Sequence, residues 1–252
     1  MKIQKWLIVA SVSGLIGAAA VAAGEKLDTA TIDTLTGLKG KMNDKEGVYK
    51  ITFPRNDVPV SVDGWKMPPF MGLGTWAAFT EMQEGAMVMG DTVLFEDEVN
   101  PVMSTALDNG LSVTALHNHF LFDHPKVYFM HIGGEGSVEK LAGAVRKVYD
   151  KIKEIRGANP QPKDSFGATP LPEKNSVSPE PLNAIFGMKG DANTGMVKFT
   201  IGHPTKMHGV PISKDMGANT WAAFAGSDDN ALVDGDFAVT EDELQGSLKA
   251  LR

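Results

Sequence analysis

The sequence contains no cysteine among its 252 residues. No disulfide can therefore hold the fold together, and no thiolate can serve as a nucleophile or as a metal ligand. Any metal site has to be built from imidazole and carboxylate groups. The cysteine that carries the lipid of a lipoprotein is missing as well, so lipidation is excluded.

Runs of basic residues are also absent, and the formal net charge is −7 at pH 7. Proteins that bind a nucleic-acid backbone concentrate lysine and arginine on one face in order to neutralise phosphates. Nucleic acid is therefore excluded as a partner. No serine lies in a nucleophile elbow, and the glycines of GGEG do not have the context of a dinucleotide-binding loop. The sequence therefore carries neither the signature of a nucleophile-elbow serine hydrolase nor that of a dinucleotide-binding loop.

The first 23 residues have the pattern of a secretory signal peptide. Lys2 and Lys5 precede an apolar run, and small residues follow it up to Ala23, where we expect cleavage. A single membrane anchor is the alternative, because the run approaches the roughly 20 apolar residues that span a bilayer. The small residues at its end favour cleavage. We therefore expect a periplasmic or secreted protein with no stable membrane span after cleavage.

An internal repeat organises the rest of the chain. MGLGTWAAF, centred on Trp76, recurs as MGANTWAAF around Trp221, a shift of 145 residues, and the same shift aligns the two EDE motifs. This indicates duplication, and both tryptophans are expected to be core anchors. The predicted division is a first repeat at residues 24–156, a proline-rich connector at 157–181 and a second repeat at 182–252.

The hydrophobic periods within the first repeat predict its fold. Alternating segments such as GVYKITFPR and AMVMGDTVLF indicate half-buried strands, and SVEKLAGAVRKVYDKIKEI indicates an amphipathic helix capped by Ser137. The order β-α-β-β-α is that of a split βαβ module with helices on one face of an antiparallel sheet. The predicted class is α+β, with two tandem modules.

The second repeat is expected to be incomplete at its C-terminal end. Under the shift of 145 residues, His117 would correspond to position 262, whereas the sequence ends at Arg252. The helix predicted after Thr240 would then have no strands of its own repeat to pack on. Unless the first repeat covers this helix, we expect residues 241–252 to fray.

Four of the six histidines lie in ALHNHFLFDHPKVYFMHIGGEG, residues 115–136. Residues two apart in a strand project from one face, so His117 and His119 present both imidazoles on the same side. Imidazole nitrogen suits zinc and other divalent transition metals, and a carboxylate such as Asp123 or Glu135 could complete the set. The segment therefore predicts a site for a divalent transition metal, with zinc the leading candidate.

Two histidines compete to be the third ligand. A hairpin turn at residues 122–123 would place His124 beside the pair formed by His117 and His119. His131 would lie about 10–13 Å along the strand from His117, at about 3.3 Å per residue, unless a bulge or a wider loop intervenes. Strand geometry thus favours His124, whereas the glycine-rich exit HIGGEG keeps His131 as a candidate.

Two classes of function fit this pattern. An ion with an open coordination position would activate water for hydrolysis, with Glu135 or Asp123 as a candidate general base. Alternatively, the chain is a non-catalytic module whose duplicated domains bind an envelope ligand, a small molecule or a partner.

The motifs LGTWAAF, VDGDFAVTEDEL and the histidine-rich segment resemble the LppY/LpqO family of exported bacterial proteins, which is defined by domain of unknown function 1259. The resemblance implies an envelope protein of two copies, each with a histidine-rich strand before its last helix. His117, Asn118, His119 and His131 match the family pattern, whereas His124 does not. The resemblance implies no particular activity.

Overall fold

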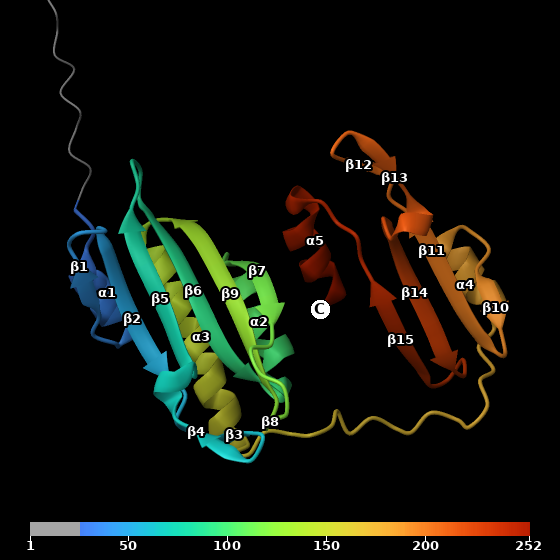
Figure 1. The fold of residues 1–252 in the computed structure, drawn as a ribbon, viewed down its shortest axis with the longest axis horizontal. Coiled ribbons are helices and arrows are strands. Elements are labelled where there is room, and N and C mark those ends of the chain that lie inside the picture. Colours follow the sequence, from blue (N-terminus) through green and yellow to red (C-terminus); the bar gives the residue numbers. More distant parts are fainter. Residues whose placement is uncertain (1–25) are drawn as a thin grey trace, which may run out of the picture.

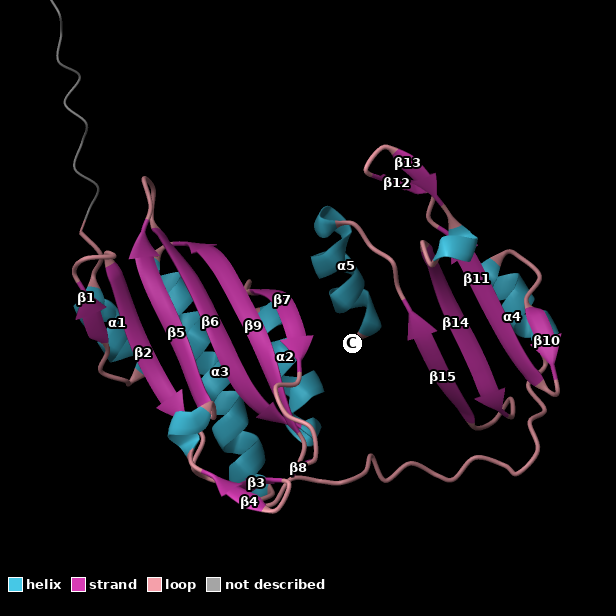
Figure 2. Ribbon diagram, in the orientation of Figure 1, coloured by secondary structure: helices cyan, strands magenta, loops and turns pink. Residues whose placement is uncertain are grey.

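The structure is a computed structural model that describes residues 26–252, so the predicted signal peptide lies outside the described residues. It has a mixed α+β architecture with antiparallel sheets, as Figures 1 and 2 show. Two units, each built around one main sheet, are joined by a segment with no helix and no strand between Ala158 and Pro179. None of the helices in the described part of the chain combines the length and apolar character needed to cross a membrane.

The first unit contains a six-stranded sheet in the order β1-β2-β5-β6-β9-β7, in which all neighbours are antiparallel. Three helices cover one face of this sheet (Figure 1), and the opposite side is called here the open face. The strands are β1 (Lys41–Asn43), β2 (Val48–Pro54), β5 (Gly74–Glu81), β6 (Ala86–Phe95), β7 (Ser112–His117) and β9 (Val127–Gly136), and the helices are α1 (Thr29–Thr36), α2 (Val99–Asp108) and α3 (Val138–Ala158).

Successive side chains along each strand point alternately to the helix-covered face and to the open face of the sheet. Ala77, Phe79 and Val88 are fully buried against the helices, together with Val145 of α3. The Ser137 hydroxyl accepts a hydrogen bond from the backbone N–H of Lys140 at 3.3 Å and so caps α3. The predicted cap is confirmed, and α3 buries one apolar side on the sheet.

A small three-stranded sheet covers one end of the open face. It consists of β3 (Val60–Val62), β4 (Trp65–Met67) and β8 (Asp123–His124) in the order β4-β3-β8. Between it and the main sheet lies a second core, to which Phe95, Val127 and Phe129 contribute. The rest of the open face, including Trp76, is left without a covering layer of helices.

Trp76 therefore does not occupy the position expected from the sequence. It is half-buried on the open face, and the Lys50 Nζ lies 4.0 Å from the centre of its ring. The expectation that it anchors the main core is wrong, because alternation along β5 turns its neighbour Ala77 toward the helices instead.

The EDE motif of the first unit belongs to a buried ionic network. Glu98 is 0 % exposed and accepts two hydrogen bonds from Arg55, at 2.7 and 2.9 Å. Asp57 also pairs with Arg55, while Asp97 pairs with Arg156 near the end of α3. The network thus ties strand, loop and helix together.

The second unit is built on a four-stranded sheet in the order β10-β11-β14-β15. One helix, α4, packs on this sheet through Phe186 and Phe199, whose rings stack with centres 4.2 Å apart. Val233 is 56 % exposed, whereas its counterpart Val88 is 0 % exposed. The elements are α4 (Pro179–Phe186), β10 (Asp191–Asn193), β11 (Met196–Gly202), β14 (Asn219–Gly226), β15 (Ala231–Asp236), the hairpin β12 (Thr205–Met207) and β13 (Val210–Ile212), and α5 (Glu241–Leu251).

The last helix, α5, packs on the first unit rather than on its own sheet. Leu248 contacts the core of the first unit, and Arg252 pairs with Asp108 of α2. Figure 1 shows α5 lying between the two main sheets. The helix thus has no strands of its own repeat to pack on, as expected, and the exception named for that expectation applies, because the first unit covers the helix.

Candidate functional site

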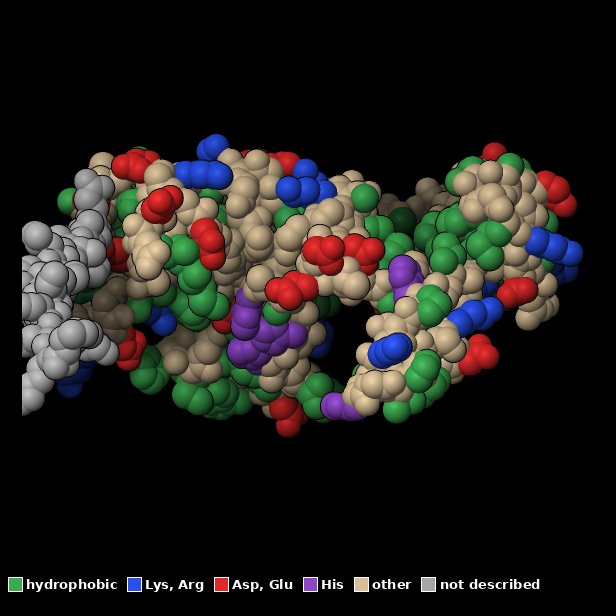
Figure 3. All heavy atoms as spheres, turned by 90° about the horizontal axis from the view of Figure 1, so that it is seen from above, with side chains coloured by type: hydrophobic (Ala, Val, Ile, Leu, Met, Phe, Trp, Pro, Cys, Tyr) green, Lys and Arg blue, Asp and Glu red, His purple; other side chains and the backbone are tan. Residues whose placement is uncertain are grey.

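Three neighbouring strands bring histidine and aspartate side chains together on the open face. Asp91 of β6 is directly opposite His131 of β9, and His131 is opposite Ala115 of β7. His117 ends β7, and His119 follows two residues later. We call Asp91, His117, His119 and His131 the histidine cluster, and Figure 3 shows histidine side chains gathered at the surface of the first unit.

A β-bulge decides which face His117 occupies. Val113 pairs with Ile132, but the register then shifts, so that Ala115 pairs with His131 and His117 with Phe129. A regular continuation would have placed His117 opposite Tyr128, because a one-residue slip turns each following side chain to the other face. The bulge therefore puts His117 on the same face as His131. A bulge is one of the conditions under which His131 is expected to reach His117 and His119, and β7 contains that bulge.

The imidazole rings are in close contact. The Nε2 atoms of His117 and His119 are 3.0 Å apart, a distance at which one nitrogen carries the proton and donates to the other. The ring centres of His117 and His131 are 4.9 Å apart. His119 also stacks on Phe129, with ring centres 3.7 Å apart and an angle of 6° between the planes. Phe129 thus fixes the orientation of one imidazole.

Asp91 places a poorly compensated carboxylate beside these rings. Its side chain is 14 % exposed, and Oδ1 is buried with no hydrogen-bond partner. The nearest cationic candidate is His131, whose Nε2 is 4.0 Å from that oxygen. Burial raises the pKa of Asp91 despite the opposing influence of the three histidines. Burial, followed by the proximity of His117, lowers the pKa of His119.

The donor set suits a divalent transition metal. A tetrahedral zinc ion with bonds of about 2.0–2.1 Å separates two ligand nitrogens by roughly 3.3 Å, close to the His117–His119 distance. The orphaned oxygen of Asp91 would supply a carboxylate ligand. In residues 26–252, however, no group of three or more histidine, aspartate or glutamate side chains is arranged to hold an ion as it stands.

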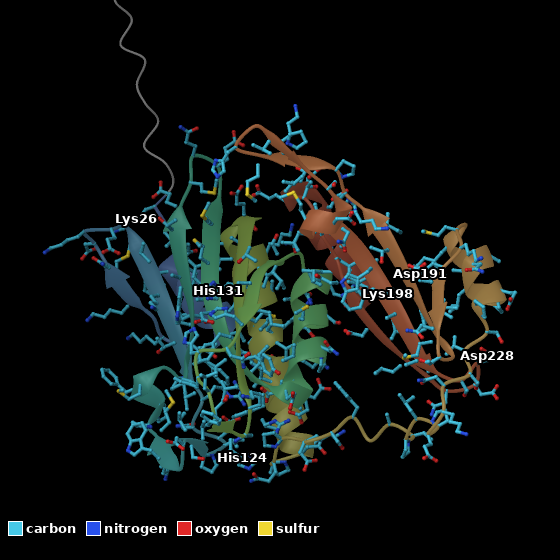
Figure 4. All side chains as sticks on the ribbon, turned by 45° about the vertical axis from the view of Figure 1, so that its right-hand side comes forward. Lys26, His124, His131, Asp191, Lys198 and Asp228 are labelled. Carbon is cyan, nitrogen blue, oxygen red and sulfur yellow. The ribbon has the colours of Figure 1, made fainter. Side chains whose placement is uncertain are left out.

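The other residues predicted for the site lie elsewhere. His124 belongs to β8 and pairs with Ser61 of the small sheet, and Figure 4 shows it well apart from His131. The expected turn at residues 122–123 is wrong, because the loop after His119 pairs with β3 rather than folding straight back onto β9. This pairing removes His124 from the cluster.

Neither candidate general base is placed beside the imidazoles. The Asp123 carboxylate is buried and accepts hydrogen bonds from the Lys126 Nζ and the Val127 N–H, both at 2.7 Å. It therefore stabilises the loop. Glu135 is exposed and lies four residues beyond His131 on β9, about 13 Å away at 3.3 Å per residue.

Sequence reasoning missed Asp91 as a member of the cluster. The available signal was the repeat itself, because Gly90-Asp91 recurs as Gly235-Asp236 at the same shift. Both aspartates stand opposite the tryptophan of their unit, Trp76 or Trp221. That recurrence marks a position, but it does not reveal which side chains approach it from β7 and β9.

Comparison with known proteins identifies the family. No match was found among curated proteins or among solved structures. A family model described as Domain of Unknown Function (DUF1259) matches residues 30–151 and 180–252. This confirms the resemblance seen in the sequence, and the two matched segments support a repeated domain. The chain therefore belongs to the DUF1259 family.

Proposed function

We propose that the histidine cluster binds a divalent transition metal, with zinc the leading candidate. The observation that carries the proposal is the 3.0 Å approach of the His117 and His119 nitrogens beside a buried Asp91 oxygen that has no partner. His117, His119, His131 and Asp91 would hold the ion. These residues come from β6, β7 and β9 and the loop after β7, so most of the ligand set rests on a rigid sheet.

The electrostatics of the cluster support a cation at this position. Burial, and after it the proximity of His117, lowers the pKa of His119 and so favours its neutral, metal-binding form. The Oδ1 atom of Asp91 is buried without the donor that such an oxygen normally has. A divalent ion would replace the proton shared by His117 and His119 and compensate the carboxylate.

Hydrolysis is the reaction class that we propose to assay. With three of these four side chains as ligands and water in the remaining position, a bound ion would lower the pKa of that water toward 7 and so supply a nucleophile. In this chain, His119 stacked on Phe129 would orient one ligand, and the second core behind Phe129 would exclude water from that side. Asp123 and Glu135 are not positioned to act as the general base.

Metal analysis of purified, zinc-reconstituted protein tests the proposal. We expect one equivalent of zinc in the wild type, a loss of most of it in His117→Ala and His119→Ala, and full retention in His124→Ala. His124→Ala is the matched control because it removes a histidine of the same loop region that lies outside the cluster. Absence of stoichiometric metal from the reconstituted wild type, or equal loss in all three variants, would overturn the proposal.

The second candidate is a non-catalytic module that binds a small molecule or an envelope ligand. A cavity of about 340 Å³ lies where the connector meets the first unit, between Asp97, Asn100 and Phe166. That volume is in the range of small-molecule sites. Saturable binding that Phe166→Ala abolishes and His117→Ala leaves unchanged would favour this function over metal binding.

We also propose that both units are copies of one β-α-β-β-α module, divided as residues 24–156 and 182–252 with the connector at 157–181. In both units the first four sheet positions follow the same order, β1-β2-β5-β6 and β10-β11-β14-β15. The Lys198 Nζ lies 4.0 Å from the centre of the Trp221 ring, and the Lys50 Nζ lies at the same distance from the centre of the Trp76 ring. The first unit continues with α2, β7, β9 and α3, which supply the rest of the module.

Export to the periplasm or the medium is proposed from the first 23 residues. Their positive start, apolar run and small-residue end support cleavage after Ala23. The mass of the protein recovered from its native cell would test this. A mature N-terminus at Gly24 is expected, and a retained Met1 would contradict it.

A further inference from the structure

A glutamine of the second unit bonds to the strand that carries His117. The Gln245 Nε2 donates to the Val113 carbonyl at 2.9 Å, and the Val113 N–H donates to the Gln245 Oε1 at 3.0 Å. Both backbone groups of one β7 residue are thus satisfied by one side-chain amide. β7 is an edge strand of the six-stranded sheet, and Gln245 supplies the two hydrogen bonds that a neighbouring strand would otherwise make to Val113.

Gln245 holds Val113, and the register of β7 on β9 shifts directly after this residue. Val113 is the last regular partner before the bulge, and Ala115 is the first after it. Because the bulge decides the face on which His117 lies, movement of Val113 would change the approach of His117 to His131. The geometry of the cluster is therefore linked to α5 through the Val113 backbone, to which the Gln245 side chain makes its hydrogen bonds.

Other contacts of α5 hold Gln245 in place. Leu248 packs on the core of the first unit. Arg252 donates to the Ser104 carbonyl at 2.9 Å and pairs with Asp108. These contacts fasten the helix to α2, so the amide of Gln245 is presented to Val113 from a fixed position. They also offer a control, since Arg252 anchors the same helix away from the bulge.

We infer that Gln245 is a positioning residue for the histidine cluster, so that the second unit completes the site of the first. This inference rests on the proposed function for its consequence in metal affinity. Its structural part, the control of the bulge by the second unit, does not depend on metal. Two kinds of measurement separate these parts.

The first experiment measures zinc affinity by calorimetry in the full chain. Gln245→Met keeps the length and packing of the side chain but removes both hydrogen bonds, and Gln245→Ala removes both packing and bonds. We expect each to weaken zinc binding by about tenfold, the effect typical of residues that orient metal ligands. Arg252→Ala should stay within twofold of the wild type. Wild-type affinity in Gln245→Met, or equal weakening in Arg252→Ala, would overturn the inference.

The second experiment needs no metal. Ring protons of His117 and His131 should give a nuclear Overhauser cross-peak in the metal-free wild type, because their ring centres are 4.9 Å apart. The cross-peak should disappear in Gln245→Met and persist in Arg252→Ala. If the wild type binds no zinc, the proposed function fails, yet this cross-peak still decides the inference. Its persistence in Gln245→Met would refute the positioning role.

Discussion

Replacing Glu98 with alanine should strongly destabilise the first unit. The carboxylate is fully buried and accepts hydrogen bonds from Arg55 at 2.7 and 2.9 Å and from the Phe95 N–H at 2.8 Å. Its Oε1 is also 2.9 Å from the Nε of Arg156. Alanine would leave two buried guanidinium groups short of a partner. We expect a loss of about 3 kcal/mol in the free energy of unfolding, because breaking a buried ion pair costs roughly 3–5 kcal/mol.

The lower end of that range applies because both arginines keep one carboxylate. Arg55 retains the Nε and Nη2 bonds to Asp57, both 2.9 Å long. Arg156 retains its ion pair with Asp97. A domain's net stability is only about 5–15 kcal/mol, so the expected loss is a large fraction of the total.

Glu243→Ala is the matched control, because Glu243 is the counterpart of Glu98 in the second repeat. Its carboxylate is exposed and accepts from the Thr240 N–H at 2.9 Å as a helix cap. We therefore expect a much smaller effect there. Urea unfolding followed by fluorescence measures both in a protein of residues 24–252. In a Trp221→Phe background, Trp65 and Trp76 report on Glu98→Ala in the first unit. In a Trp65→Phe, Trp76→Phe background, Trp221 reports on Glu243→Ala in the second. A loss below about 1 kcal/mol for Glu98→Ala would refute the reasoning.

Two further predictions concern other carboxylates. Burial disfavours ionisation of Asp57, but hydrogen bonds from Arg55 and the attraction of Arg55 prevail and lower the pKa of Asp57. The folded-state pKa of Asp57 is therefore below the unfolded value of about 3.9. The stability that the ionised carboxylate contributes is present above the unfolded value and is lost as the pH falls through the folded-state pKa. The melting temperature should therefore fall on acidification below about pH 4, and Asp57→Asn should make this fall shallower; an unchanged profile would contradict the assignment. Asp91→Asn should raise the melting temperature of the metal-free protein at pH 7, because it removes a charge whose buried Oδ1 has no partner. The same change should weaken zinc binding, because it removes the carboxylate ligand. A lower melting temperature would show that the carboxylate stabilises the metal-free fold.

The placement of the histidines shows where sequence reasoning stops. Spacing alone puts His117 and His119 on one side of a strand, since side chains alternate with a period of two. It does not reveal the bulge between Val113 and Ala115, because bulges depend on pairing with a partner strand. Nor does it show that His124 pairs with Ser61, more than 60 residues away in the chain. The third histidine could not be chosen without these pairings.

The sequence by itself determined the α+β class, the internal repeat, the cap of α3 and the concentration of histidines in one segment. These features depend on local periodicity and on identity between two stretches of one chain. Only the tertiary structure decided that Asp91 joins the imidazoles, that Trp76 lies on the open face and that α5 packs on the first unit. Each of these follows from strand register or helix docking between distant segments. Such contacts are set by the burial and hydrogen bonding of the whole fold, which local patterns do not specify.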